Sequence, residues 1–191
     1  VYEALEDAGL ARDRLAGTEV GVYVGASTMT HGARLGHDPL ATDPYVMTGN
    51  TLSLVSNRVS YALDLRGPSL TVDTACSSSL FAFNLAAMAL ARGEIDTAIV
   101  AGSNVLLDPI HFSGFSAARM LSPTGRSRPF SADADGYVRS EAIVAFVLER
   151  KDIASIAPRR PRAKLLGVGT NSDGHTLTAA LPSLVGQTDL L

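Results

Sequence analysis

The sequence contains little cysteine and little charge, and each shortage excludes a class of protein. A single cysteine among 191 residues excludes an internal disulfide and provides no cysteine cluster for a metal ion. Charged residues make up 18% of the chain, against a typical ~25%, while 46% are hydrophobic. The net charge of −3 gives no electrostatic basis for nucleic-acid binding. We therefore expect a tightly packed protein, with much of the chain buried internally or against a partner.

Long hydrophobic runs and targeting signals are absent as well. No apolar run approaches the ~18 residues that span a bilayer, and no secretory signal peptide opens the chain. We expect a cytoplasmic protein that does not enter the membrane.

Short apolar runs alternate with helical patterns along most of the chain. Strands are predicted at residues 20–25, 69–72, 97–102, 142–148 and 163–168, and helices at 1–8, 52–63 and 80–91. This alternation predicts an α/β fold with a largely parallel sheet, in which one antiparallel strand would not be recognised from sequence.

The single cysteine, Cys76, lies where a predicted strand meets a predicted helix. Three serines, at positions 77–79, are expected to cap and open that helix. Every residue from 80 to 91 except Asn84 is apolar, and Arg92 and Gly93 then end the helix. A helix that is apolar on all sides is expected to be buried, and Asn84 then needs a hydrogen-bond partner.

Two interpretations of Cys76 follow from this position. A thiol attacks as a thiolate, and the N–H groups and dipole at a helix N-terminus favour that form. A strand, a sharp turn and a buried helix also form the nucleophile elbow of hydrolases, although no Gly-x-Ser-x-Gly motif is present. The alternative is that Cys76 is a small buried hydrophobic residue.

Residues 122–136 form a long polar segment rich in turn-forming residues. Loops of this length are often functional, and the alternative is a surface excursion. Asp133 and Asp135 lie as in a calcium loop, but a third acidic position and the distal glutamate are missing. Gly167 and Gly169 are a weak signal for a dinucleotide-binding turn and are better interpreted as a strand end.

Residues 71–80, Thr-Val-Asp-Thr-Ala-Cys-Ser-Ser-Ser-Leu, resemble the active-site signature of the β-ketoacyl synthase domains of polyketide synthases and multifunctional fatty acid synthases. Other segments resemble further landmarks of that family in the same order, at 49–50, 56–61, 64–69, 98–105, 120–125, 135–141 and 171–174. Val138 and Ser140 depart from the pattern, because many relatives have glycine there.

The resemblance implies a thiolase-like layered α/β fold built from two similar halves. This chain, 1–191, resembles a partial ketosynthase domain: most of the first half, without its opening strand region, and from about residue 160 the start of the second half. The implied first half has a mostly parallel sheet and a buried helix following the nucleophile.

The implied chemistry is that of a condensing acyltransferase. Cys76 would accept an acyl chain from an acyl carrier protein thioester, and a malonyl-type extender would lose CO₂ and condense onto it. The backbone N–H of Cys76 would be one oxyanion donor. The family uses two histidines from later motifs, and His31, His37, His111 and His175 match none of these. The isolated 191 residues are therefore expected to be inactive in condensation.

The resemblance also implies partners. These are the acyl carrier protein, other synthase domains and a second copy of the domain, paired through the strand before Cys76. No nucleotide, metal or organic cofactor is implied in this domain, since the substrates are carried on the phosphopantetheine of the carrier. The only basic run, Arg159, Arg160, Arg162 and Lys164, would be either a solvated linker or a docking surface for that acidic carrier.

Two alternatives remain open. One is a non-catalytic structural or chain-length-setting partner within a synthase, although such partners usually lack the cysteine. The other is a thiolase or a related acyltransferase of the same fold.

Overall fold

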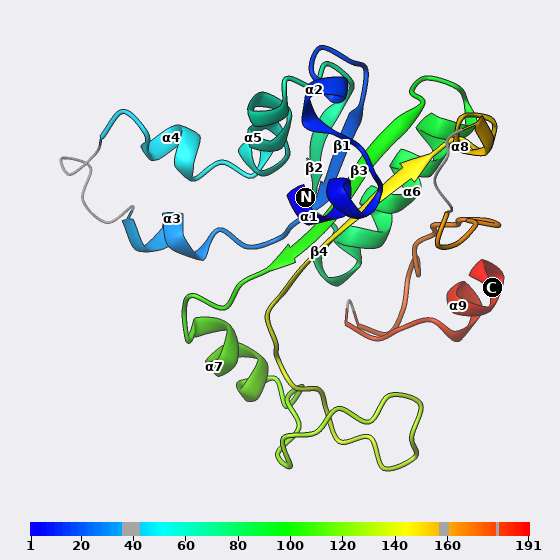
Figure 1. The fold of residues 1–191 in the computed structure, drawn as a ribbon. Helices are drawn as coiled ribbons and strands as arrows, with labels where there is room; N and C mark the ends of the chain where they lie inside the picture. Colours follow the sequence, from blue (N-terminus) through cyan, green and yellow to red (C-terminus); the bar gives the residue numbers. More distant parts are fainter. Residues whose placement is uncertain (36–42, 157–160, 179) are drawn as a thin grey trace.

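A four-stranded sheet forms the centre of the computed structural model, which describes residues 1–35, 43–156, 161–178 and 180–191. Its strands are β1 (Gly21–Gly25), β2 (Ser69–Val72), β3 (Thr97–Asn104) and β4 (Ala142–Glu149), in the order β2-β1-β3-β4 (Figure 1). β1 pairs in parallel with β2 and β3, whereas β4 is antiparallel to β3. The predicted α/β fold with a mostly parallel sheet is confirmed.

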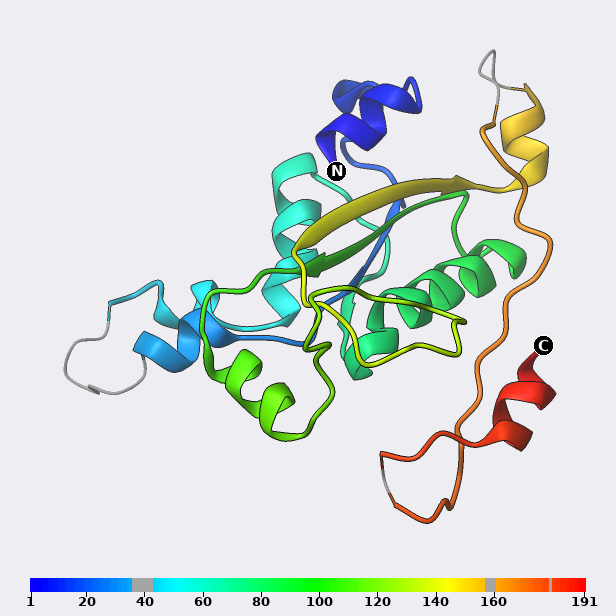
Figure 2. The ribbon, with the colours of Figure 1, turned by 90° about the horizontal axis from the view of Figure 1, so that it is seen from below.

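Helices cover both faces of this sheet. α6 (Ser78–Ala91) lies on one face, and α1 (Tyr2–Asp7), α2 (Arg12–Leu15) and α5 (Ser53–Leu63) lie on the other (Figure 2). Successive strand residues therefore enter different cores. Val22 and Val24 pack with the α1, α2 and α5 side, while Tyr23 packs with α6. This period of two is what a strand buried on both faces requires.

The remaining helices lie outside these layers. They are α3 (Thr30–Leu35), α4 (Val46–Gly49), α7 (Ile110–Ala117), α8 (Lys151–Ile156) and α9 (Leu184–Leu190). α3 follows β1 and α7 follows β3, so both lie beyond the carboxyl ends of parallel strands (Figure 1). Across the described part of the chain, no helix combines the length and the hydropathy that a membrane span needs.

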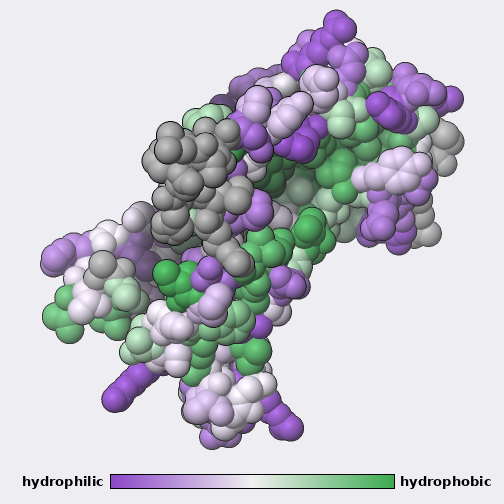
Figure 3. All heavy atoms as spheres, turned by 90° about the vertical axis from the view of Figure 1, so that its left-hand side faces the viewer, coloured by the Kyte–Doolittle hydropathy of each residue, from purple (hydrophilic) through white to green (hydrophobic). Residues whose placement is uncertain are grey.

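Helix α6 is buried on only one side. Ala82 and Ala86 are fully buried against the sheet, whereas Leu80 is 72% exposed and Leu85 and Met88 are more than one third exposed. The expectation of burial on all sides thus holds only for the sheet-facing half, because one sheet covers one side of a helix. Asn84 is buried and donates from Nδ2 to the Met88 sulfur at 3.7 Å. Figure 3 shows the side of the molecule that is on the left in Figure 1, and apolar side chains, in green, are exposed in the middle of that face.

The prediction of a strand at 163–168 is wrong. These residues have no strand pairing, and Leu165, Leu166 and Val168 are exposed. A strand is stable when its backbone groups pair with a neighbour, and this segment pairs with no strand among the described residues. Just after it, Asn171 Nδ2 donates to the Gly186 carbonyl of α9 at 2.6 Å. The dinucleotide-turn interpretation loses the strand that it requires.

Candidate active site

Cys76 lies in the turn that joins β2 to α6. β2 ends at Val72, a short 3-10 helix spans Ala75–Ser77, and α6 begins at Ser78. The predicted order of strand, turn and helix is confirmed, and the Cys76 side chain is exposed. Within the described chain, the thiol is thus not packed as a buried hydrophobic residue.

Side chains within the turn hold it in an uncommon conformation. Ala75 has φ +53°, a left-handed backbone that costs a non-glycine residue about 1–2 kcal/mol. Its N–H donates to Asp73 Oδ1 at 2.9 Å, and its carbonyl accepts from Ser78 Oγ at 2.6 Å. Ser78 Oγ also accepts from the Thr74 N–H at 2.9 Å. The backbone on both sides of Ala75 is therefore fixed by hydrogen bonds.

The serines act differently from the sequence prediction. The N-cap residue of α6, Ser77, makes no capping hydrogen bond to the helix, and its Oγ donates to the Thr74 carbonyl at 2.8 Å. Ser77 and Ser78 thus brace the turn that carries Cys76 instead of capping α6. Each hydroxyl bonds to the carbonyl three residues earlier, at Thr74 or Ala75, and both of these residues lie in the turn.

Two glycines allow the first turn of α6 to lie directly on the sheet. Gly25 and Gly102 are register partners in β1 and β3. A Cβ on Gly25 would collide with the backbone of Ser78 and Ser79, and one on Gly102 would lie 2.8 Å from the Ser79 Cβ. Both collisions are far inside van der Waals contact, so only glycine fits at either position.

A cleft of about 220 Å³ lies at the carboxyl ends of strands β1 and β3. Its walls come from the segment after β1, the start of α5 and the end of β3, and include Ala26, Thr28, Met29, His31, Asn50, Leu52, Val55, Ser103 and Leu107. Ligands of open parallel sheets bind in crevices at the carboxyl ends of the strands, which is where β2 also delivers Cys76.

The histidines occupy different parts of the molecule. His31 lies in α3 and lines the cleft, which its sequence surroundings did not indicate. His111 lies on α7, and His175 lies in the extended segment before α9. His37 is outside the described residues.

The polar segment 122–136 folds around one carboxylate. Asp135 accepts hydrogen bonds from Ser122 at 2.8 Å and Thr124 at 2.9 Å, and its carboxylate lies 2.9 Å from Arg128. The Ser122 hydrogen bond, followed by those of Thr124 and Arg128, holds the pKa of Asp135 below its usual value. Because the Arg128 guanidinium already pairs with this carboxylate, the segment is poorly suited to bind calcium. The part of the chain that the structure describes also contains no cluster of metal-ligating side chains.

Arg139 connects this segment to α7. Its guanidinium carbon lies 4.8 Å from the ring centre of Phe115 and 5.5 Å from that of Phe112, and Nη1 donates to the Tyr137 hydroxyl at 3.3 Å. Glu141 Oε1 accepts from the Leu106 N–H at 2.6 Å. The motif at 135–141 therefore joins the loop, α7 and the end of β3, a role that sequence reasoning did not assign to it.

Val138 and Ser140, the two residues that depart from the family motif, make hydrogen bonds through their backbone. The Val138 N–H donates to Ser127 Oγ at 2.9 Å, and the Ser140 carbonyl accepts from Asn104 Nδ2 at 2.7 Å. Both contacts use the backbone, so the side chains at 138 and 140 do not disturb them.

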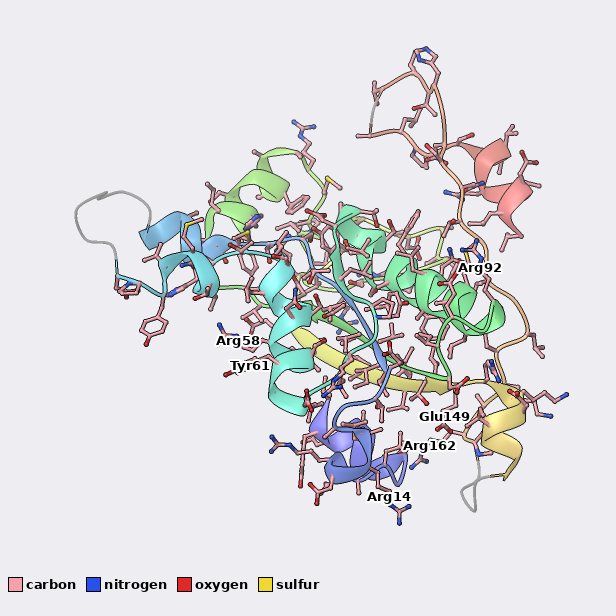
Figure 4. All side chains as sticks on the ribbon, turned by 90° about the horizontal axis from the view of Figure 1, so that it is seen from above. Arg14, Arg58, Tyr61, Arg92, Glu149 and Arg162 are labelled. Carbon is pink, nitrogen blue, oxygen red and sulfur yellow. The ribbon has the colours of Figure 1, made fainter. Side chains whose placement is uncertain are left out.

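The basic run is only partly described. Arg162 forms a two-pronged ion pair with Asp7 of α1, and it lies beside that helix in Figure 4. This hydrogen bonding lowers the pKa of Asp7. Lys164 is exposed, and Arg159 and Arg160 lie outside the described residues.

Comparisons with known proteins agree on one family. The model of the β-ketoacyl synthase N-terminal domain matches residues 1–154. The whole chain is 44% identical to a segment of a hybrid PKS-NRPS synthetase from Thermothelomyces thermophilus, and it is 43% identical over 190 residues to a highly reducing polyketide synthase from Didymella fabae. It spans only 5% and 10% of these relatives.

A solved structure extends the likeness to the fold. The ketosynthase from module 6 of the bacillaene synthase of Bacillus subtilis superposes on 99% of this chain with a TM-score of 0.83 and 35% identity. The matched part is 32% of that ketosynthase. The expected thiolase-like α/β fold class is therefore confirmed.

Proposed function

Because this chain belongs to the β-ketoacyl synthase family, we propose that it supplies the nucleophile of a condensing acyltransferase in polyketide or fatty acid biosynthesis, and that Cys76 is this nucleophile. The observation that carries the proposal is an exposed thiol held on a braced strand-to-helix turn within the matched region, residues 1–154.

The first proposed step is transfer of an acyl chain to Cys76. The Cys76 sulfur attacks the thioester carbonyl carbon of an acyl chain carried on the phosphopantetheine of an acyl carrier protein. A new carbon–sulfur bond forms, the carrier's carbon–sulfur bond breaks, and the carrier thiol takes up the proton. The backbone N–H of Cys76, at the start of the helix, is the proposed donor to the oxyanion.

The second proposed step forms the carbon–carbon bond. A malonyl-type extender loses CO₂, the resulting enolate attacks the acyl carbon, and the Cys76 sulfur leaves. The two histidines that assist this step in the family belong to motifs that none of the four histidines of this chain matches. We therefore propose that the 191 residues alone do not complete condensation.

The proposed domain division places a partial ketosynthase domain at 1–191, with its second half beginning near residue 160. The family match ends at residue 154 and the sheet ends at Glu149, and both observations support this boundary.

Exposed apolar side chains on α6 and β4, such as Leu80 and Phe146, support contacts with further synthase domains and a second copy. The proposed setting is a cytoplasmic synthase in which this domain uses no cofactor of its own.

The alternative of a non-catalytic partner is less well supported, because Cys76 is present and exposed.

The decisive experiment incubates the complete synthase with an acyl-carrier thioester and maps the acylated residue by mass spectrometry, with Cys76→Ala as control. An intact synthase that shows no acyl group on Cys76 would contradict the proposed function. Release of CO₂ from a malonyl-carrier substrate then separates condensation from a thiolase-like acyl transfer.

A further inference from the structure

Helix α5 and strand β2 meet through hydroxyl groups. Thr71 Oγ1 donates to Ser56 Oγ at 3.0 Å and accepts from the Ser56 N–H at 3.2 Å. Ser56 Oγ in turn donates to the Ser53 carbonyl at 3.1 Å, and Ser60 Oγ donates to Ser69 Oγ at 2.8 Å. We call these two contacts, Ser56–Thr71 and Ser60–Ser69, the hydroxyl ladder.

The ladder is buried where an apolar contact would be expected. Ser56 is fully buried and Ser60 is 7% exposed, and they are the two buried residues of α5. Arg58 and Tyr61 project from the other side of the helix, away from the sheet (Figure 4). A buried hydroxyl that loses its partner is penalised by its desolvation, so these pairs oppose any displacement of α5 against β2.

Within the described chain, the hydroxyl ladder acts together with the β1 pairing to determine the register of β2. The strand is four residues long and lies at the edge of the described sheet, paired with β1 alone. Leu70 and Val72 pack on the α6 side, which leaves Ser69 and Thr71 to face α5. A slip of one residue would exchange these two faces, and a slip of two would move the strand by about 7 Å.

The register of β2 determines the place of the thiol, because Cys76 follows Thr71 by only five residues. A displacement of a reacting group by about 1 Å can reduce a rate about 100-fold. We propose that Ser56 and Thr71 are positioning residues for the acylation of Cys76, acting through the register of β2. The inference depends on the proposed function, since it assumes that Cys76 is the acylated residue.

The test compares Thr71→Ser, the double variant Ser56→Ala/Thr71→Val, and Thr97→Val as a matched control at the start of β3. Each is made in the complete synthase. Three quantities are measured: the acylation rate at saturating acyl-carrier thioester, the substrate concentration for half-maximal rate, and the urea midpoint of the domain.

Thr71→Ser keeps the hydroxyl and is expected to acylate at the wild-type rate, as is Thr97→Val. The double variant removes both hydroxyls, but the N–H of residue 56 loses the Thr71 acceptor, so the urea midpoint is expected to fall modestly while the domain stays folded. It is nevertheless expected to acylate about 100-fold more slowly at saturation, with an unchanged half-maximal concentration.

Three outcomes overturn the inference. They are a double variant that acylates normally, a double variant whose acylation rate falls only as far as its folded fraction does, and a folded Thr71→Ser variant that acylates slowly. Failure of the wild-type synthase to acylate Cys76 contradicts the proposed function instead, so the two failures are distinguished.

Discussion

Gly25 and Gly102 face each other across the β1–β3 pair and together form the surface on which the first turn of α6 rests. Neither position has room for a Cβ, because the backbone of Ser79 or its side chain already occupies that space. The position of the turn that carries Cys76 therefore depends on two glycines from other strands.

Gly25→Ala is expected to lower the free energy of unfolding by about 1–3 kcal/mol, because the added methyl group collides with backbone atoms that cannot rotate away. Urea unfolding measures the effect. Gly114→Ala on α7 is the control, since the space that its added methyl group would occupy has no neighbouring atom within 4 Å and alanine favours the helix. Equal stability of the two variants would contradict the close approach of α6.

Ala75→Gly is expected to leave the free energy of unfolding unchanged or to raise it by up to about 1 kcal/mol. Glycine removes the cost of the left-handed backbone at φ +53° and adds chain entropy to the unfolded state, and these effects oppose each other. Ala91→Gly at the exposed end of α6 should instead lose about 0.5–1 kcal/mol. A clear loss of stability in Ala75→Gly would show that residue 75 is not strained.

Asp135 is expected to make stability depend on pH in the acid range. Its hydrogen bonds to Ser122 and Thr124 and its pairing with Arg128 lower its pKa in the folded state. Its stabilising contribution is therefore fully present above the unfolded-state pKa, near 3.9, and is lost as the pH falls through the lower folded value.

The measurement compares the urea unfolding of the wild type and Asp135→Asn from neutral pH downward. The difference between the two proteins should be constant at neutral pH and shrink below about pH 4. Asp133→Asn, in the same loop, provides the control and should not remove this acid dependence. A difference between wild type and Asp135→Asn that grows on acidification would refute the assignment.

Arg139→Lys is expected to lose about 0.5–1 kcal/mol of stability, because lysine cannot lie flat over the Phe115 and Phe112 rings as a guanidinium does. Arg126→Lys, at an exposed position of the same loop, serves as the matched control. The urea midpoint of each variant, followed by circular dichroism, measures this loss. Identical midpoints for the two variants would argue against the stacked arrangement.

Most elements near Cys76 were predictable because their signals are local. The valine-rich run before Gly25, the β-branched run before Cys76 and the apolar run after it each determine their own secondary structure through period and propensity. The predicted helix at 52–63 corresponds to α5 within one residue. The same local logic overestimated the burial of α6 and predicted a strand at 163–168, because burial and pairing depend on what lies beside a segment.

The sequence by itself determined the order of strands and helices, the place of the single thiol at a strand-to-helix junction, and the family to which its motifs point. Tertiary structure alone decided that β4 runs antiparallel, that the serines after Cys76 brace a left-handed turn, and that Ser56 and Thr71 pair across 15 positions of sequence. The physical reason is range: propensity and periodicity act between near neighbours in the chain, whereas hydrogen bonds and packing between elements exist only after the sheet has brought them together.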